Sequence, residues 1–171
     1  MTTATASASA FFYVDGIPTK GAWVDLDSST TWEDIAQAIR EKIPGADCDE
    51  ILCADAEGLA EEFLSSYDFF ELKSFSEWME AVERSHLDPE IIAAYCSNMG
   101  EWTPEGVTNA EECYAGTYDS DEEFAEDLAD QLGLLDQVPE SLRYYFDMSR
   151  WANDLLMSDY FVSDGHYFQN R

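Results

Sequence analysis

The sequence predicts an α+β fold, with strands in the first and last thirds of the chain and helices in the middle. Hydrophobic residues make up 46% of the 171 residues, aromatic residues make up 14%, and only five residues are proline. Chains that stay disordered are poor in aromatic and β-branched residues, so this chain is expected to fold around a core. Its length suits one ordinary domain or about two to three small lobes.

Changes in the local pattern divide the chain. The first ten residues contain only Met, Thr, Ala and Ser, without the basic and apolar regions of a signal peptide. Strand signals follow, give way to repeated helix starts, and return in the last third. A Pro-containing turn segment over 101–106 suggests a seam. We therefore expect a flexible tail over 1–10, an α+β lobe over 11–62, a helical lobe over 63–106 and an α+β lobe over 107–171.

A capped helix among three strands defines the first lobe. Thr31 precedes an amphipathic pattern that starts at Trp32 and stops at Pro44-Gly45, which is typical of a capped helix. A loop with two glycines and a proline separates two short apolar runs before it. The expected strands cover 11–14, 22–26 and 50–54, and the expected helix covers 32–43.

Two helices are expected in the middle lobe. Ser74 and Glu77 have the spacing of a capping box ahead of an apolar face. Asp88-Pro89 opens the second helix, because proline is favoured in the first helical turn, and Gly100 ends it. No strand signal interrupts this region.

The last lobe contains a helix with an acidic face. Ser120, three residues before Glu123, predicts its start, and Gly133 predicts its end. Phe124, Leu128 and Leu132 share its apolar face, while the opposite arc carries carboxylates at i,i+4 spacing. Each such like-charge pair destabilises a helix by about 0.2–0.5 kcal/mol. The remaining signals are Pro139 and Asp147, each opening a short helix, and Asp164-Gly165, the turn of a hairpin over 160–168.

The charge is the main clue to function. Eight Lys and Arg residues face 37 Asp and Glu residues, so the formal net charge is -29 at pH 7. A compact state with this much like charge repels itself, and natural domains rarely keep such a field without using it. B-DNA carries one charge per about 1.7 Å of axis, so this charge corresponds to roughly 49 Å of duplex. The same charge repels nucleic acids and anionic membranes, which leaves a basic protein surface as the natural partner.

Enzymatic and metal-binding functions find no support in the motifs. The best calcium-loop match, over 119–124, has Phe124 where an EF-hand requires glycine. No nucleophile elbow, zinc-protease, Walker A or dinucleotide-binding motif occurs, and His86 and His166 stand apart from any recognisable nucleophile. We expect no enzyme activity, no cofactor and no metal site.

The remaining composition indicates a cytoplasmic protein. No stretch approaches the roughly 20 apolar residues of a membrane span. The cysteines lack any CxxC pairing and are expected to be reduced and mostly buried. We expect core packing for Trp23, Trp32, Trp78, Trp151 and the cluster Tyr144-Tyr145-Phe146, because a nucleic-acid stacking platform needs a basic groove. Trp102, at a lobe boundary, suits a seam or a dimer contact as well as a core position.

The order and spacing of several short segments resemble the ArdA family of antirestriction proteins, from about residue 11 to the end. The C-terminal segments are the most specific. The matching segments are Gly21-Ala22-Trp23, Ala93-Ala94-Tyr95, Asn98-Met99-Gly100-Glu101, Tyr114-Ala115-Gly116, 119–125, Pro139, Leu142, Tyr145-Phe146-Asp147, Trp151, Asp154-Leu155-Leu156 and 164–168.

The resemblance implies an elongated, highly acidic homodimer of three-lobed subunits. Such proteins mimic DNA, occupy the DNA-binding groove of Type I restriction-modification enzymes and protect incoming mobile DNA. Two copies would extend the imitation to about 100 Å of duplex. The expected DNA-mimic carboxylates are Asp119, Asp121, Glu122, Glu123, Glu126, Asp127 and Asp130. The expected dimer contact comprises Ala94, Met99, Gly100 and Trp102, which are apolar or small amid acidic neighbours.

A second function stays open at this point. Charge alone also fits an acidic interaction protein, such as a chaperone for another basic, DNA-binding partner. A mimic needs carboxylates spread over a long face at phosphate-like intervals, whereas a generic acidic partner needs only a local patch. The placement of the carboxylates therefore decides between the two.

Overall fold

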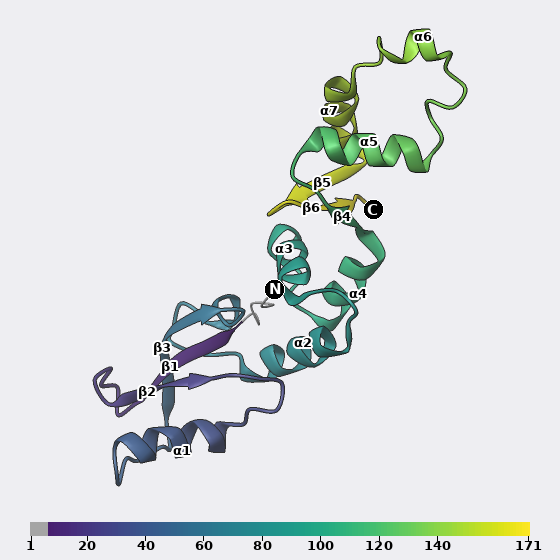
Figure 1. Ribbon diagram of the computed structural model, residues 1–171. Coiled ribbons are helices and arrows are strands. Elements are labelled where there is room, and N and C mark those ends of the chain that lie inside the picture. The colour runs from purple at the N-terminus through teal and green to yellow at the C-terminus, as the bar shows by residue number, and fades with distance from the viewer. Residues whose placement is uncertain (1–6) are drawn as a thin grey trace.

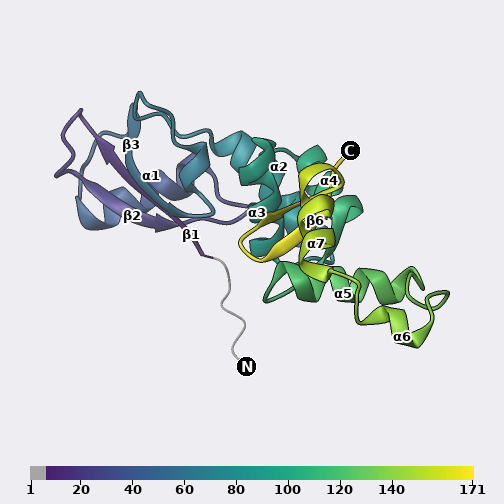
Figure 2. The same ribbon diagram turned by 90° about the horizontal axis from the view of Figure 1, so that it is seen from above.

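A computed structural model describes residues 7–171 of the chain. This part contains seven α-helices, one short 3-10 helix and two antiparallel three-stranded sheets. The first sheet has the order β2 (Gly21–Asp25), β1 (Ala8–Val14), β3 (Ile51–Gly58), and the second has the order β4 (Tyr114–Thr117), β6 (His166–Gln169), β5 (Tyr160–Ser163). Figure 1 shows the two sheets in different parts of the molecule, with helices α2, α3 and α4 between them. The view from above agrees, with β1–β3 and α1 at one end and α5 and α6 at the other (Figure 2). The expected α+β fold class is confirmed.

The three strands of the first sheet and α1 form in the predicted order, although β1 and β3 are longer than expected. Thr31 caps α1: its hydroxyl accepts from the Asp34 backbone N–H (3.3 Å), and the Asp34 carboxylate accepts from the Thr31 N–H (2.8 Å). Ile35 and Ile39 on the inner face of α1 are fully buried. The elements are β1 (Ala8–Val14), β2 (Gly21–Asp25), α1 (Trp32–Lys42) and β3 (Ile51–Gly58).

The expected tail over 1–10 is wrong for its last three residues. Strand β1 begins at Ala8, and the side chains of Ala8 and Ala10 are buried in the core. Just before the strand, the Ser7 carbonyl accepts from the Leu59 N–H (3.1 Å). Sequence patterns missed this start because Ala and Ser have no strand preference. Residues 1–6 lie outside the described residues.

The middle of the chain is helical, as expected, but one helix start differs. Helix α2 begins at Leu72, so Ser74 lies inside its first turn and forms no capping box. Helix α3 follows the prediction, with Pro89 in its first turn and Gly100 ending it at φ 68°. The elements are η1 (Glu61–Phe63), α2 (Leu72–Arg84), α3 (Pro89–Met99) and α4 (Pro104–Cys113).

Helix α4 replaces the seam that was expected over 101–106. Thr103 caps it by accepting from the Gly106 N–H (3.1 Å), and Pro104 occupies its first turn. Val107 and Ala110 are buried where α4 packs with α2 and α3. The expected boundary between residues 106 and 107 therefore falls inside a helix. The division into three lobes itself stays a prediction.

Two hydrophobic clusters hold the described elements together. The larger one runs from the first sheet through α2, α3 and α4 and ends at Phe168 of the second sheet. Within it the rings of Trp78 and Trp102 lie 5.1 Å apart. The smaller cluster joins α5, α7 and the second sheet through five buried residues: Phe124, Ala125, Ala152, Leu155 and Tyr167.

The second sheet closes with the predicted hairpin. Asp164 and Gly165 both have positive φ (50° and 79°), which a two-residue turn between antiparallel strands requires. Asp147 caps α7 by accepting from the Arg150 N–H (3.0 Å). The elements are β4 (Tyr114–Thr117), α5 (Asp121–Gln131), α6 (Glu140–Arg143), α7 (Met148–Ser158), β5 (Tyr160–Ser163) and β6 (His166–Gln169).

Core packing was expected for too many apolar side chains. Tyr144 and Tyr145 are 90% and 79% exposed, because α6 is a single short turn that buries none of its own residues. Leu132 ends α5 and is also exposed, so it does not share the buried face of that helix. Trp23 and Trp32 lie at the surface as well, whereas Trp78 is fully buried.

Candidate functional site

Helix α5 presents the expected carboxylates on its outer surface. The Ser120 hydroxyl caps the helix by accepting from the Glu123 N–H (3.2 Å). The Glu123 carboxylate reaches past the cap to accept from the Asp119 N–H (2.9 Å). Phe124, buried on the inner face, anchors the helix. Local capping and one apolar face thus fix which way the acidic arc points.

The structure brings all seven predicted carboxylates to one short segment. Asp127 is half-buried, and the other six are exposed: Asp119, Asp121, Glu122, Glu123, Glu126 and Asp130. From Glu122 to Asp130 the helix axis rises by about 12 Å at 1.5 Å per residue, and five carboxylates occupy that length. Their spacing along the axis is therefore about one charge per 3 Å.

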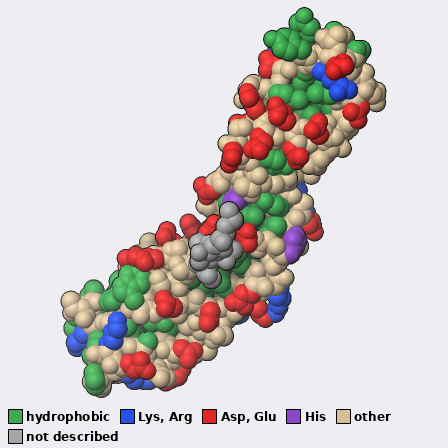
Figure 3. Space-filling view, viewed as in Figure 1, with side chains coloured by type: hydrophobic (Ala, Val, Ile, Leu, Met, Phe, Trp, Pro, Cys, Tyr) green, Lys and Arg blue, Asp and Glu red, His purple; other side chains and the backbone are tan. Residues whose placement is uncertain are grey.

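Within residues 7–171, no Lys or Arg side chain forms an ion pair with this segment. Six ion pairs form in the described part of the chain, and none of them includes a residue of α5. The sequence contains no Lys or Arg between Arg84 and Arg143. On the face shown in Figure 3, Asp and Glu side chains are spread along the upper half, and the Lys and Arg side chains visible there gather near the tip.

Neutral side chains hold several of these carboxylates. The Tyr167 hydroxyl donates to Asp121 (2.6 Å), and the Tyr118 hydroxyl donates to Asp127 (2.6 Å). The Gln131 amide also donates to Asp127 (2.6 Å), and Ser149 donates to Glu122. Sequence reasoning missed these donors, because Tyr167 and Asp121 are 46 residues apart and no local pattern links them.

Burial raises the pKa of both phenols above the ordinary tyrosine value. Desolvation, followed by the hydrogen bond to Asp127, raises the pKa of Tyr118 to about 12. Desolvation and the hydrogen bond to Asp121 raise the pKa of Tyr167 as well. Both hydroxyls are therefore donors at neutral pH, and neither adds nor removes charge.

The expected dimer-contact residues divide into two pairs. Met99 is 46% exposed and Gly100 is exposed beside it, at the end of α3. Ala94 is buried within the chain, and Trp102 is half-buried against Trp78 and Phe63. Only Met99 and Gly100 thus offer a substantial free surface, and Trp102 takes the core position that its sequence context left open.

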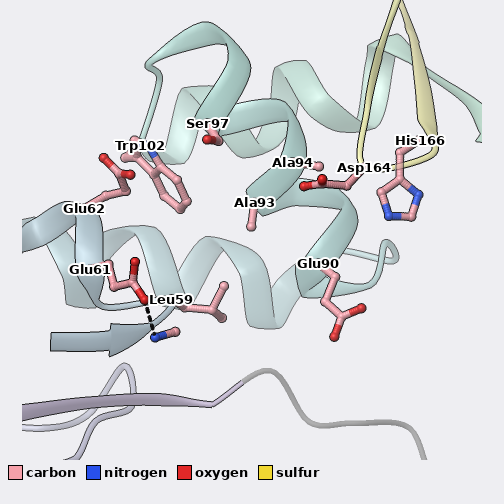
Figure 4. A pocket seen from close by; sticks show the side chains of 11 residues that line it. Leu59, Glu61, Glu62, Glu90, Ala93, Ala94, Ser97, Trp102, Asp164 and His166 are labelled. Carbon is pink, nitrogen blue, oxygen red and sulfur yellow. Dashed lines mark hydrogen bonds between the residues drawn. The ribbon is translucent and has the colours of Figure 1, made fainter.

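A cavity of about 480 Å³ lies beside these residues (Figure 4). Ala94 and Trp102 line it from α3 and the following loop, and Asp164 and His166 line it from the hairpin. The Glu61 carboxylate at its edge accepts from the Gly58 N–H (3.2 Å). Its carboxylate-rich lining repels anionic ligands.

Each histidine lies beside a polar side chain. His166 Nδ1 lies 2.7 Å from the Thr117 hydroxyl, a neighbour that sequence inspection missed. The two residues face each other across the β4–β6 pair, so the strand register accounts for the contact. His86 follows α2, and its Nδ1 lies 3.1 Å from the Glu111 carboxylate.

The best calcium-loop match and the cysteines both occupy structural positions in the fold. Residues 119–124 form a helix cap and first turn, with Phe124 1% exposed, and do not form a loop. Across residues 7–171 no three His, Cys, Asp or Glu side chains converge on a possible metal position. The four cysteines are free and mostly buried, as expected, and burial raises the pKa of Cys53 and Cys96 to about 11.

Helix α5 thus presents an acidic face whose residues take part in no ion pair within residues 7–171. The model of one protein family, described as "Antirestriction protein (ArdA)", matches residues 10–169. The chain belongs to the ArdA family of antirestriction proteins, and its function is antirestriction. A comparison with curated proteins found no match. None of the helices in the described residues is both long and apolar enough to cross a bilayer.

Proposed function

We propose that this protein is a DNA mimic that occupies the DNA-binding groove of a Type I restriction-modification enzyme. Antirestriction then follows from competition: the enzyme holds the acidic protein, and incoming mobile DNA escapes cleavage. The protein acts in the cytoplasm, where such an enzyme meets the DNA. No chemical step on either partner is needed.

The spacing of the α5 carboxylates carries the proposal. One charge per about 3 Å lies between the 1.7 Å spacing of both strands of B-DNA and the 3.4 Å spacing of one strand. Because no ion pair in the described residues includes α5, each carboxylate there can meet a Lys or Arg of the target. A groove that binds DNA by displacing counterions from phosphates would accept such a surface.

Shape supports the same proposal. An elongated, highly acidic surface can lie along a groove built for duplex DNA, and the sheets and helices follow one another along the molecule in Figure 1. A generic acidic chaperone for a basic partner needs no particular length or charge spacing. If variants with the same number of carboxylates at other surface positions bound the target equally well, the generic chaperone would be favoured.

A titration tests the proposal. Purified protein is added to a Type I enzyme bound to fluorescently labelled DNA, and DNA release is followed by anisotropy. Release at stoichiometric concentration supports the mimic. A basic protein that does not bind DNA serves as the specificity control. It should bind this chain far more weakly than the enzyme does. If the enzyme keeps its DNA at saturating protein, the mimic is wrong.

We also propose that two copies associate through the surface around Met99 and Gly100, so that the acidic face extends along a bipartite target site. Association must overcome mutual repulsion between copies, and salt weakens such repulsion by screening. Light scattering at micromolar concentration should therefore give a dimer that tightens as salt rises. A Met99→Glu variant should be monomeric, and a parent protein that stays monomeric in high salt would contradict the dimer.

A further inference from the structure

We propose that Tyr118 and Tyr167 are positioning residues for the DNA-mimic surface: they hold the Asp127 and Asp121 carboxylates in place without cancelling their charge. The inference rests on the proposed function and adds to it the groups that order the imitation phosphates. A cationic donor neutralises the carboxylate that it binds, whereas a neutral hydroxyl donor only orients it.

The two contacts have the geometry of strong hydrogen bonds. Each phenol oxygen lies 2.6 Å from its carboxylate oxygen, within the short range of bonds from a hydroxyl to an anion. Asp121 lies in the first turn of α5 and Asp127 about 1.7 turns further on, so the two bonds fix the acidic arc at two separate points.

Core packing fixes the positions of the hydroxyls. The Tyr167 ring stacks on Phe124 with centroids 4.5 Å apart, and the Tyr118 ring lies 5.5 Å from each of these rings. Tyr167 is 2% exposed and Tyr118 is half-buried. The phenol hydroxyls extend outward from this cluster to the carboxylates. The packed rings therefore restrict the positions of the carboxylates at the surface.

A cationic donor would have removed the charge that the site uses. In the first half of the chain, Arg40 pairs with Glu33 and Arg84 pairs with Glu80, and each pair is neutral overall. Tyr118 and Tyr167 provide comparable hydrogen bonds and leave the carboxylates fully charged. A side chain that is already ordered also loses less entropy when the target binds.

Tyrosine-to-phenylalanine variants test the inference, because they keep the ring and remove only the hydroxyl. Tyr160 supplies a matched control: it packs 5.0 Å from Phe124 in the same cluster, and its hydroxyl makes no hydrogen bond to any described residue. We expect Tyr118→Phe and Tyr167→Phe each to weaken DNA displacement about two- to fivefold, the range for one ordered charge contact. Tyr160→Phe should displace DNA as the parent does.

A double-mutant cycle separates positioning from structural support. In an Asp121→Asn background there is no charge to position, so Tyr167→Phe should then cause no further loss of DNA displacement. Tyr118→Phe should likewise lose its effect in an Asp127→Asn background. The carboxyl carbon chemical shift of Asp121, measured by NMR, should move in Tyr167→Phe and not in Tyr160→Phe.

The possible results distinguish this inference from the proposed function. If the parent does not displace DNA, the proposed function fails. If neutralising the α5 carboxylates abolishes displacement while Tyr118→Phe and Tyr167→Phe act as the parent does, the function stands and the positioning role is overturned. An equal loss from Tyr167→Phe with and without Asp121 would assign it a merely structural role. Should Tyr167→Phe fail to fold, the Tyr118–Asp127 cycle gives the same test independently.

Discussion

Helices α1 and α5 have the same length and opposite treatments of charge. Each has 11 residues, a hydroxyl cap and a buried apolar face. Helix α1 carries Arg40 and Lys42 in its last turn, where cations favour the helix dipole, and Arg40 pairs with Glu33. Helix α5 has three acidic residues in its first turn and no basic residue in its last.

The comparison shows that α5, unlike α1, carries a charge pattern that lowers its own helix stability. The Arg40–Glu33 ion pair and the basic last turn stabilise α1 as a helix, whereas Asp130 near the end of α5 opposes the dipole and like charges repel along its face. Packing of Phe124 and the capping of Ser120 hold α5 in spite of this repulsion. A helix that keeps an unfavourable charge pattern on a packed frame is best explained by a partner that uses the charge.

The strongest way to break this comparison is to neutralise α5. A variant with Glu122, Glu123 and Glu126 changed to Gln and Asp127 and Asp130 changed to Asn should displace DNA about a hundredfold less well, since each contact contributes on the order of 0.2–1 kcal/mol. Its free energy of unfolding, from urea denaturation, should be unchanged or higher, because the repelling i,i+4 pairs are gone. A folded variant that inhibits as the parent does would refute the role of this face.

Matched pairs of substitutions sharpen the comparison. Glu126→Gln with Asp130→Asn on α5 should weaken DNA displacement about three- to tenfold, because both carboxylates are exposed and lie outside every ion pair of the described residues. Glu33→Gln with Glu41→Gln removes the same charge from α1 and should change it by less than about twofold. Titrations at equal ionic strength measure both. Equal losses would mean that total charge, and not its placement on α5, decides binding.

A single substitution should have a modest effect. Glu126→Gln alone should reduce affinity for the enzyme by less than about tenfold, because one exposed charge contact contributes at most about 1 kcal/mol. Surface plasmon resonance against the immobilised enzyme provides the affinity. If a folded Glu126→Gln protein no longer inhibited the enzyme, inhibition would depend on one essential residue and not on a distributed surface.

The smallest expected effect is a pH dependence confined to the α5 region. The pKa of Tyr118 is about 12 in the folded protein and about 10 when unfolded, so its contribution to stability is complete below pH 10. That contribution is lost as pH rises through about 12, because only the unfolded state gives up the proton readily. Urea denaturation at several alkaline pH values should show a smaller decline for Tyr118→Phe than for the parent. Parallel declines would contradict the assignment.

Local signals predicted much of this fold. The Thr31 and Ser120 caps, the Pro89 helix start and the Asp164-Gly165 turn each depend on residues within one turn of chain, so spacing alone reveals them. The start of α4 was missed although Thr103-Pro104 has the same local form as a cap followed by a first-turn proline. There a Pro-containing segment was interpreted as a turn when it was a helix start.

Tertiary contacts account for the remaining differences. Ala8 joins β1 because a neighbouring strand covers it, and nothing in an Ala- and Ser-rich segment indicates that partner. Tyr144 and Tyr145 follow the four-residue helix α6, which buries none of its residues, and both side chains are exposed. The acidic arc of the site could be predicted from helical periodicity, but its phenol donors could not, because Tyr167 reaches α5 only through the folded sheet.

Competition with DNA tests the central claim most directly. The protein concentration that half-inhibits DNA cleavage by a Type I enzyme is measured over a range of DNA concentrations. If the α5 carboxylates take the place of phosphates, protein and DNA exclude each other, and that concentration should rise linearly with the DNA concentration. A half-inhibiting concentration independent of DNA would show that the protein acts elsewhere on the enzyme and would contradict the account.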